Sequence, residues 1–323
     1  MPLHRRTLLG SVVALAGASA GASAWAQSEP ALRLIVPFTP ATGIDLIARQ
    51  IGPHLAERLG RPVVVDNRPG ASGNIGTEAV VRAPADGGTL LVTVNTLVMN
   101  RALYPNLAFD PVRDLDPITL TSWGTLLLVA SKRSGITTAQ QMVAKALARP
   151  GLLNYGSPGA GTPHHLAMEL LKNRTGSFIT HIPYRGTGPA LTDLLGGQID
   201  LMFLPIHVAL QHVQNGDLKA LGISSAKPSP LLPGVPPLRE LKLGDLDVEM
   251  WYGVLAPKGT PTPIVERLNR ELKDILARTD VRTAFETQGM QPAYSTPDAF
   301  RQLIVADARR WSDLVKAQGI TAG

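Results

Sequence analysis

Short apolar segments alternate with amphipathic segments over residues 32–94. Residues 32–36, 63–65 and 90–94 are rich in Leu, Ile and Val and predict strands. Residues 44–59 repeat apolar side chains at helical spacing, and residues 74–81 predict a second helix. Pro53 predicts a kink or a break in the first helix. Strands that alternate with helices across short loops predict a parallel sheet in an α/β lobe.

The pattern restarts near residue 125 and ends in helices. Strands are predicted at 125–131, 152–155, 178–182, 199–204, 218–223 and 248–255, and helices at 138–148, 163–173 and 189–195. Residues 263–277, 281–287 and 297–317 predict a helical tail, whose last apolar stripe we assign to core packing. We therefore expect two lobes, formed by residues 27–124 with 256–323 and by residues 125–255. The chain would cross between them near Trp123 and near Trp251.

The first 26 residues predict an export signal. Arg5 and Arg6 precede an uncharged stretch over residues 7–28, and Ala24-Trp25-Ala26 fits a signal-peptidase site. A membrane anchor is the alternative, but the segment is only weakly hydrophobic. The paired arginines also fit a twin-arginine signal, so the choice between Sec and Tat export stays open. We expect a periplasmic protein cleaved near Ala26.

Composition and charge exclude several classes of protein. The 323 residues carry 31 Lys and Arg against 25 Asp and Glu, a net charge of +6, and no cysteine. Because residues 1–26 hold two of the arginines, the rest of the chain carries +4, dispersed among acids, which excludes a nucleic-acid interface. The lack of cysteine excludes disulfides, thiolate metal sites and a lipoprotein anchor. No later segment approaches the ~20 apolar residues of a membrane-spanning helix.

Four predicted strand–helix junctions carry glycines and hydroxylated residues. Each leaves unpaired backbone N–H groups at a helix N-terminus, where an anion is the natural ligand. In parallel α/β sheets such loops lie at the carboxyl edge of the strands, where ligands bind. One loop of this kind is more often a plain turn, but two in each lobe favour a binding site. The loops are residues 38–43, 69–73, 157–162 and 184–188.

Enzyme signatures are absent or incomplete. The chain contains no Walker A sequence, and the spacing of Gly70, Gly73 and Gly76 is not that of a dinucleotide site. Ser157 lacks the first glycine of a nucleophile elbow, and Pro158 has no N–H for an oxyanion hole. We therefore expect no catalytic residue, and an exported hydrolase that uses Ser157 is the weaker alternative.

The histidines give no metal-site pattern. His165 and Glu169 are four residues apart and can face the same way on a helix, but no third ligand is evident. His181, His207 and His212 each stand alone. We expect neither a metal nor another cofactor.

Several longer motifs occur in order along the chain. They are residues 36–40 followed by Asp45 and residues 48–49, then residues 66–73, 153–157, 181–190, 193–200 and 251–257. These motifs resemble those of the Bug family, periplasmic solute-binding proteins of the tripartite tricarboxylate transporter type. The resemblance covers nearly all of the chain after the signal.

The resemblance implies an α/β fold of the type II periplasmic-binding-protein kind, a two-lobed Venus flytrap with two inter-lobe crossings. A small mono- or dicarboxylate would lie between the lobes, bridged by ordered waters to the first loop, and would not be chemically changed. The implied contacts in the first lobe are Phe38, Thr39, Pro40, Ala41, Thr42, Gly43, Asp45, Gly70, Ser72 and Gly73. Those in the second lobe are Ser157, Gly159, Ala160, Gly161, Thr162, His164, Tyr184, Arg185, Gly186 and Thr187.

Two features refine this expectation. Ala41 and Thr42 stand where the family commonly has two glycines, so methyl groups are expected to narrow the water-bridged site. Arg185 is the one charged donor in the set and a candidate anchor for a second carboxylate. The predicted strand over residues 201–204 ends at the cleft without an acidic residue, which disfavours an amino acid, with its ammonium group, as the ligand. The implied partners are membrane transporter subunits or, alternatively, a membrane sensor protein, with the binding protein a monomer.

Overall fold

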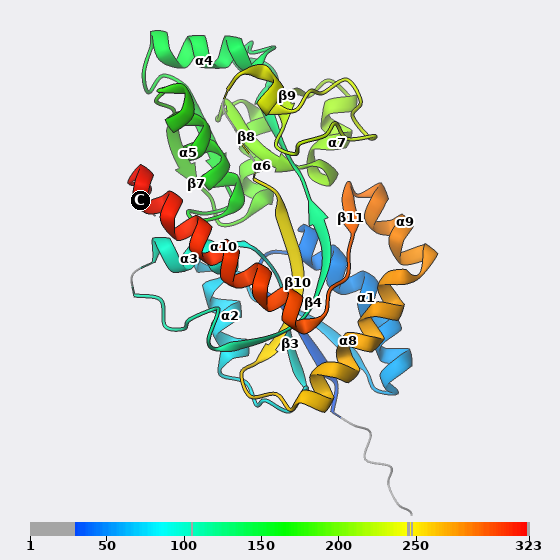
Figure 1. The fold of residues 1–323 in the computed structure, drawn as a ribbon. Helices are drawn as coiled ribbons and strands as arrows, with labels where there is room; N and C mark the ends of the chain where they lie inside the picture. Colours follow the sequence, from blue (N-terminus) through cyan, green and yellow to red (C-terminus); the bar gives the residue numbers. More distant parts are fainter. Residues whose placement is uncertain (1–29, 105, 244–245, 247, 322–323) are drawn as a thin grey trace, which may run out of the picture.

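The computed structural model describes residues 30–104, 106–243, 246 and 248–321. The predicted signal segment, residues 1–26, lies outside them. Within the described chain, two β-sheets form two lobes, one above the other in Figure 1, and helices cover both. In this part of the chain, no helix combines the length and the apolar character needed to span a membrane.

Six strands form the sheet of the first lobe, in the order β11-β4-β10-β3-β1-β2. β1 pairs in parallel with β2 and β3, but β10 is antiparallel to β3 and β4, and β11 is antiparallel to β4. The predicted parallel arrangement is therefore right for the first three strands and wrong for the others. The bounds are β1 Leu32–Val36, β2 Val63–Asn67, β3 Thr89–Val94, β4 Leu115–Gly124, β10 Met250–Pro257 and β11 Met290–Pro292.

Five strands form the sheet of the second lobe, in the order β7-β6-β8-β5-β9. β6 pairs in parallel with β7 and β8, and β5 is antiparallel to β8 and β9. Both sheets thus have a parallel part and one inserted antiparallel strand. The bounds are β5 Leu126–Ser131, β6 Asn154–Ser157, β7 Thr180–Pro183, β8 Leu201–Pro205 and β9 Leu218–Ile223.

The inserted strands are the ones that arrive from the other lobe. β5 follows β4 after the single residue Thr125, and β10 carries the chain back. β10 lies between β3 and β4, and all eight of its residues are buried. The predicted boundary of the second lobe at residue 255 therefore falls inside β10, a strand of the first sheet. The return crossing lies before Met250.

Helices surround the sheets at the positions that most of the sequence pattern predicts. α1 continues through Pro53 to its end, so the predicted break does not occur. α3 and α7 follow β3 and β8 directly, and the sequence pattern did not predict them. The bounds are α1 Gly43–Leu59, α2 Asn74–Val81, α3 Thr96–Leu103, α4 Ala139–Ala148, α5 Pro163–Thr175, α6 Thr187–Gly196, α7 Ile206–Gln214, α8 Thr262–Ala277, α9 Thr279–Thr287 and α10 Pro297–Gln318.

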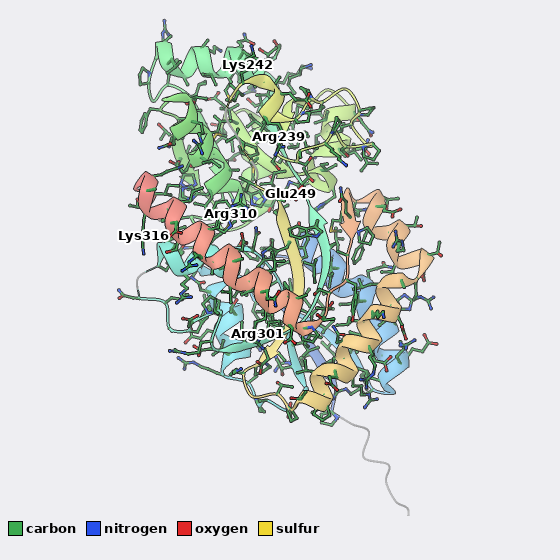
Figure 2. All side chains as sticks on the ribbon, viewed as in Figure 1. Arg239, Lys242, Glu249, Arg301, Arg310 and Lys316 are labelled. Carbon is green, nitrogen blue, oxygen red and sulfur yellow. The ribbon has the colours of Figure 1, made fainter. Side chains whose placement is uncertain are left out.

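The C-terminal helix α10 lies along the first lobe, where it packs against α3 and β4 (Figure 1). Phe300 packs edge-on against Trp251 of β10, with ring centroids 5.2 Å apart. The indole N–H of Trp251 donates to Asp307 at 2.8 Å. Figure 2 shows Arg301 near the lower end of α10, where it donates to Asp116 of β4 at 3.0 Å. The predicted apolar stripe of the tail is thus core packing.

Candidate functional site

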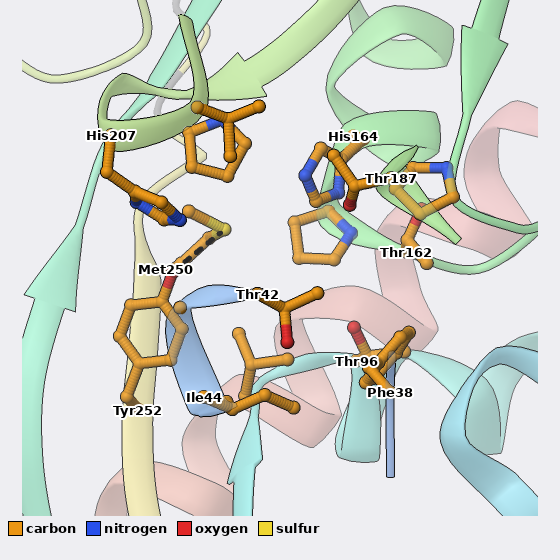
Figure 3. Close-up of a pocket in the computed structure, with 16 residues that line it drawn as sticks. Phe38, Thr42, Ile44, Thr96, Thr162, His164, Thr187, His207, Met250 and Tyr252 are labelled. Atoms are coloured by element: carbon orange, nitrogen blue, oxygen red, sulfur yellow. Dashed lines mark hydrogen bonds between the residues drawn. The ribbon is translucent and has the colours of Figure 1, made fainter. Parts of the chain in front are cut away.

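A narrow cavity of about 40 Å³ lies between the two lobes (Figure 3). Its walls come from the loops after β1 and β6, from the ends of β3 and β8, and from β10. The lining residues are Phe38, Thr42, Gly43, Ile44, Val94, Thr96, Pro158, Thr162, Pro163, His164, Thr187, Pro205, His207, Val208, Met250 and Tyr252.

Five helices begin at this cavity. α1 and α3 reach it from the first lobe with Thr42 and Thr96, and α5, α6 and α7 reach it from the second lobe with Thr162, Thr187 and Pro205. None of these five helices has a side-chain cap hydrogen bond. Their first N–H groups have no partner within the helix, and each N-terminus carries partial positive charge. The cavity is therefore built to receive an anion.

The cavity offers neutral polar groups to its ligand. Among the described residues, no Asp, Glu, Lys or Arg side chain lines it. Burial lowers the pKa of His164 to about 3, with a smaller contribution from the neighbouring His207, and burial lowers the pKa of His207 to about 4. Both rings are neutral at physiological pH. Neutral donors hold a carboxylate without burying a second charge beside it.

The side chain of Asp45 fixes the conformation of the loop after β1. Its carboxylate is 2% exposed and accepts from the backbone N–H of Ala41 at 2.9 Å, from Arg49 at 3.0 Å and from Asn67 at 2.9 Å. Asn67 also donates to the carbonyl of Phe38 at 3.1 Å. Burial by itself raises the pKa of Asp45, but these bonds outweigh it and lower the pKa below its usual value. Asp45 does not line this cavity, and its bonds position the loop that does.

Ala41 lies at the exposed tip of this loop and lines no cavity. The expectation that methyl groups narrow the site therefore rests on Thr42 alone and stays a prediction. Thr42 does line the cavity, and its hydroxyl donates to the carbonyl of Thr39 at 3.0 Å.

The backbone of Ala41 is strained. Its φ is 65°, a left-handed conformation that costs a residue with a Cβ atom about 1 kcal/mol. Ala41→Gly should raise the free energy of unfolding by about 1 kcal/mol and leave ligand affinity unchanged. Urea unfolding of the two proteins measures this change. A destabilised Ala41→Gly variant would show that the strain is absent.

Arg185 lies in a second hollow of the cleft, on the other side of Phe38 and Pro158. This hollow is lined by the loops after β1, β2 and β7. Arg185 is exposed there and is not part of the first cavity. Six further predicted site residues line the same hollow: Phe38, Thr39, Gly70, Gly73, Tyr184 and Gly186.

Ser157 and His181 form a pair that resembles a catalytic dyad. The Ser157 Oγ lies 2.7 Å from Nε2 of His181. However, Ser157 is fully buried, and its hydroxyl also donates to the carbonyl and accepts from the N–H of Gly159. Burial lowers the pKa of His181 to about 3. These bonds fix the loop that precedes α5, so the pair is structural.

His165 and Glu169 belong to a buried network below that loop. The rings of Tyr155, His181 and His165 stack, with centroids 4.7 Å apart for the first pair and 4.3 Å for the second. Glu169 accepts from Tyr155 at 2.5 Å and from Lys172 at 2.6 Å. His165 accepts from the N–H of Gly161 at 3.2 Å. The described residues contain no cluster that could hold a metal ion.

The two lobes touch directly at the loop before α5. Ser72 of the first lobe donates to the carbonyl of Ala160 at 2.6 Å, and Tyr104, which follows α3, donates to the same oxygen at 3.1 Å. The side-chain amide of Asn100 donates to the backbone carbonyl of Ser72 at 2.9 Å and fixes the position of Ser72. Gly159 and Gly161 allow the lobes to come this close. A Cβ atom on Gly159 would lie 2.6 Å from the hydroxyl of Ser72, and one on Gly161 would lie 2.6 Å from the side-chain oxygen of Asn100. We call this group the inter-lobe latch.

Removing one donor of the inter-lobe latch should speed ligand release. In Ser72→Ala, Ala160 keeps only the bond from Tyr104, and a lost hydrogen bond of about 1 kcal/mol gives about fivefold faster dissociation. Stopped-flow measurement of ligand dissociation checks this, with Ser134→Ala, remote from the cleft, as control. An unchanged dissociation rate in Ser72→Ala would contradict a role for the latch in closure.

The structure brings together only part of the predicted site. Phe38, Thr42, Gly43, Thr162, His164 and Thr187 line the first cavity. Pro40, Ala41, Asp45, Ser72, Ser157, Gly159, Ala160 and Gly161 line neither hollow. Sequence reasoning missed Ile44, Val94, Thr96, Pro205, His207, Val208, Met250 and Tyr252. The rule that ligands bind where strands end would have found Thr96 and Pro205, which follow β3 and end β8.

Comparison with known proteins identifies the family. A model of the tripartite tricarboxylate transporter family receptor matches residues 47–320. The chain belongs to this family. Protein BugT of Bordetella pertussis is 36% identical over 97% of this chain and 96% of that protein. The predicted family is thereby confirmed.

Solved structures of similar proteins confirm the two-lobed binding-protein fold. The structure of an R. palustris protein with adipate has a TM-score of 0.87 at 32% sequence identity. The alignment covers 92% of this chain and 99% of that protein. MatC from Rhodopseudomonas palustris with bound malate has a TM-score of 0.82 at 32% identity, covering 88% and 98%. Members of this receptor family are solute-binding proteins and not enzymes, which confirms the predicted function class.

Proposed function

We propose that this receptor captures a small carboxylate in the cavity between its lobes and delivers it to the membrane subunits of a tripartite tricarboxylate-type transporter. The observation that carries the proposal is the convergence of five uncapped helix N-termini on a cavity without charged side chains. Partial positive charge from two lobes attracts a carboxylate most strongly when the lobes are closed around it. The relatives with adipate and malate support the same ligand class.

Calorimetric titration with mono- and dicarboxylates tests the first half of the proposal. We expect dissociation constants of about micromolar or lower for at least one acid, and at least tenfold weaker binding of its neutral amide. Binding of sugars or cations in place of carboxylates would contradict the proposal.

Delivery to a transporter needs a separate test. The membrane subunits, reconstituted in vesicles, should take up the labelled carboxylate only when this protein is added. Uptake that does not depend on the protein, together with binding to a membrane sensor, would favour the signalling alternative. We place the protein in the periplasm as a monomer, released from its signal near Ala26 and without a lipid anchor. Mass spectrometry of the exported protein and its sedimentation test these three points.

A further inference from the structure

In the second lobe, the inter-lobe latch is continuous with the wall of the ligand cavity. Its residues 159–161 stand between Pro158 and Thr162, which both line the cavity. The hydroxyl of Thr162 donates to the carbonyl of Gly159 at 2.7 Å, so the latch loop and this wall are joined by a side chain as well. A change in the position of the latch therefore moves the wall that faces the ligand.

In the first lobe, the inter-lobe latch is also joined to the cavity. Asn100, which fixes Ser72, lies on α3, and α3 begins at the cavity with Thr96. Gly73, the residue after Ser72, packs against the ring of Phe38 in the cavity wall, since a Cβ atom there would lie 2.9 Å from that ring. While the latch is closed, the walls from the two lobes are thus held at one separation.

The closed latch leaves a small cavity. Its volume of about 40 Å³ is that of about three water molecules, since one buried water takes about 10–15 Å³. A benzene-sized ligand needs about 150 Å³. A carboxylate group with one or two further carbon atoms therefore fills the cavity. Phe38 and Pro158 line both this cavity and the second hollow and separate the two spaces, so a longer acid needs walls that stand further apart.

We propose that the closed inter-lobe latch restricts the cavity to carboxylates of two or three carbon atoms. A longer acid binds only with the lobes further apart, where Ser72 and Tyr104 no longer reach the carbonyl of Ala160. The latch then contributes to the affinity for a short acid and not to the affinity for a long one. This inference rests on the proposed function and adds the size of the ligand, for acids with one or two carboxylate groups.

Two pairs of acids test the inference, with the same end groups and different lengths within each pair. Propionate and hexanoate are monocarboxylates, and malonate and adipate are dicarboxylates. In calorimetric titration, the shorter acid of the better-binding pair should bind at least about tenfold more tightly than the longer one. The double variant Ser72→Ala/Tyr104→Phe removes both donors to Ala160. It should weaken the binding of that shorter acid at least about tenfold and change the binding of the longer acid less than about twofold.

Tyr294→Phe is the matched control. The hydroxyl of Tyr294 donates to Asn269 at 2.7 Å within the first lobe, and neither residue lines the cavity or the second hollow. This variant loses a hydrogen bond of the same kind and should keep the wild-type affinities for all four acids. A general loss of stability would weaken short and long acids alike, so the difference between them isolates the latch.

The separation of the lobes gives a second measurement that leaves the latch intact. The chain has no cysteine, so Arg82→Cys in the first lobe and Leu195→Cys in the second lobe accept two spin labels at exposed positions. Pulsed electron paramagnetic resonance at saturating ligand should give a shorter distance between the labels with the shorter acid of the better-binding pair than with the longer one.

The outcomes separate this inference from the proposed function. Tighter binding of the longer acid, an equal effect of the double variant on both lengths, or equal label distances with both acids overturns the inference. Carboxylate capture then still stands, because an acid has bound. If no carboxylate of any length binds, the proposed function fails and the inference fails with it.

Discussion

Substituting Gly43 by alanine is expected to weaken carboxylate binding at least about tenfold. Gly43 is the first residue of α1, and a Cβ atom there would lie 2.8 Å from the hydroxyl of Tyr252. On the other side, the same ring lies against Gly124, where a Cβ atom would be 2.7 Å from it. The ring is buried between two glycine backbones and moves most easily toward the cavity. The added methyl group should therefore push Tyr252 into the space of the ligand.

Calorimetric titration of Gly43→Ala and Gly188→Ala measures this effect. Gly188 also lies in the first turn of a site helix, but a Cβ atom there would meet nothing within 4 Å. Gly188→Ala should bind as tightly as the wild type. Adding Tyr252→Phe to Gly43→Ala removes the clashing hydroxyl and should restore part of the affinity. Wild-type affinity in Gly43→Ala would show that the ring of Tyr252 has room elsewhere.

The protein should lose stability steeply as the pH falls from 6.5 to 5. Burial lowers the pKa of His164 to about 3 and the pKa of His165 to about 4, both far below the usual value of 6.5. The unfolded chain therefore binds protons in this pH range that the folded protein does not bind. Stability is full above pH 6.5 and falls as the pH decreases toward 4. These two residues alone cost about 3 kcal/mol between pH 6.5 and 5.

Urea unfolding at several pH values measures this dependence. The slope of the unfolding free energy against pH should correspond to at least two additional protons bound by the unfolded chain. Burial also lowers the pKa of His181 to about 3, which steepens the slope further. In His165→Gln the slope should decrease by about one proton. A stability that does not change between pH 7 and 5 would mean that these rings are protonated in the folded protein.

The alternation of strands and helices could be predicted from the sequence because most elements have clear apolar periodicity. β1, α2 and β9 have the predicted bounds. β4 was missed because Asp116 and Pro117 near its start interrupt the strand pattern, and a proline argues against a central strand. The structure accommodates Pro117 opposite Leu255, where the register of β10 shifts. α7 was missed because it begins after Pro205 without a capping side chain.

The location of the site could be predicted, but its composition only in part. Loops at strand ends are recognisable in the sequence, and Thr42, Thr162 and Thr187 do line the cavity. Tyr252 could not be found in this way, because it lies in the middle of the strand β10, and only the order of strands in the sheet brings it to the cleft. The role of Asp45 depends on three donors: Ala41 and Arg49 lie four residues before and after it, but Asn67 comes from the end of β2, and only the pairing of β1 with β2 brings it close.

The position of β10 has a consequence for the order in which the two lobes can be completed. All strands of the second sheet lie within residues 126–223, whereas the first sheet needs β10 between β3 and β4. A growing chain can therefore complete the second lobe first, while the first lobe waits with an open gap beside β3. The first lobe can obtain its central strand only after residues 250–257 have become available. The lobe that begins first along the chain is thus the last whose sheet can be completed.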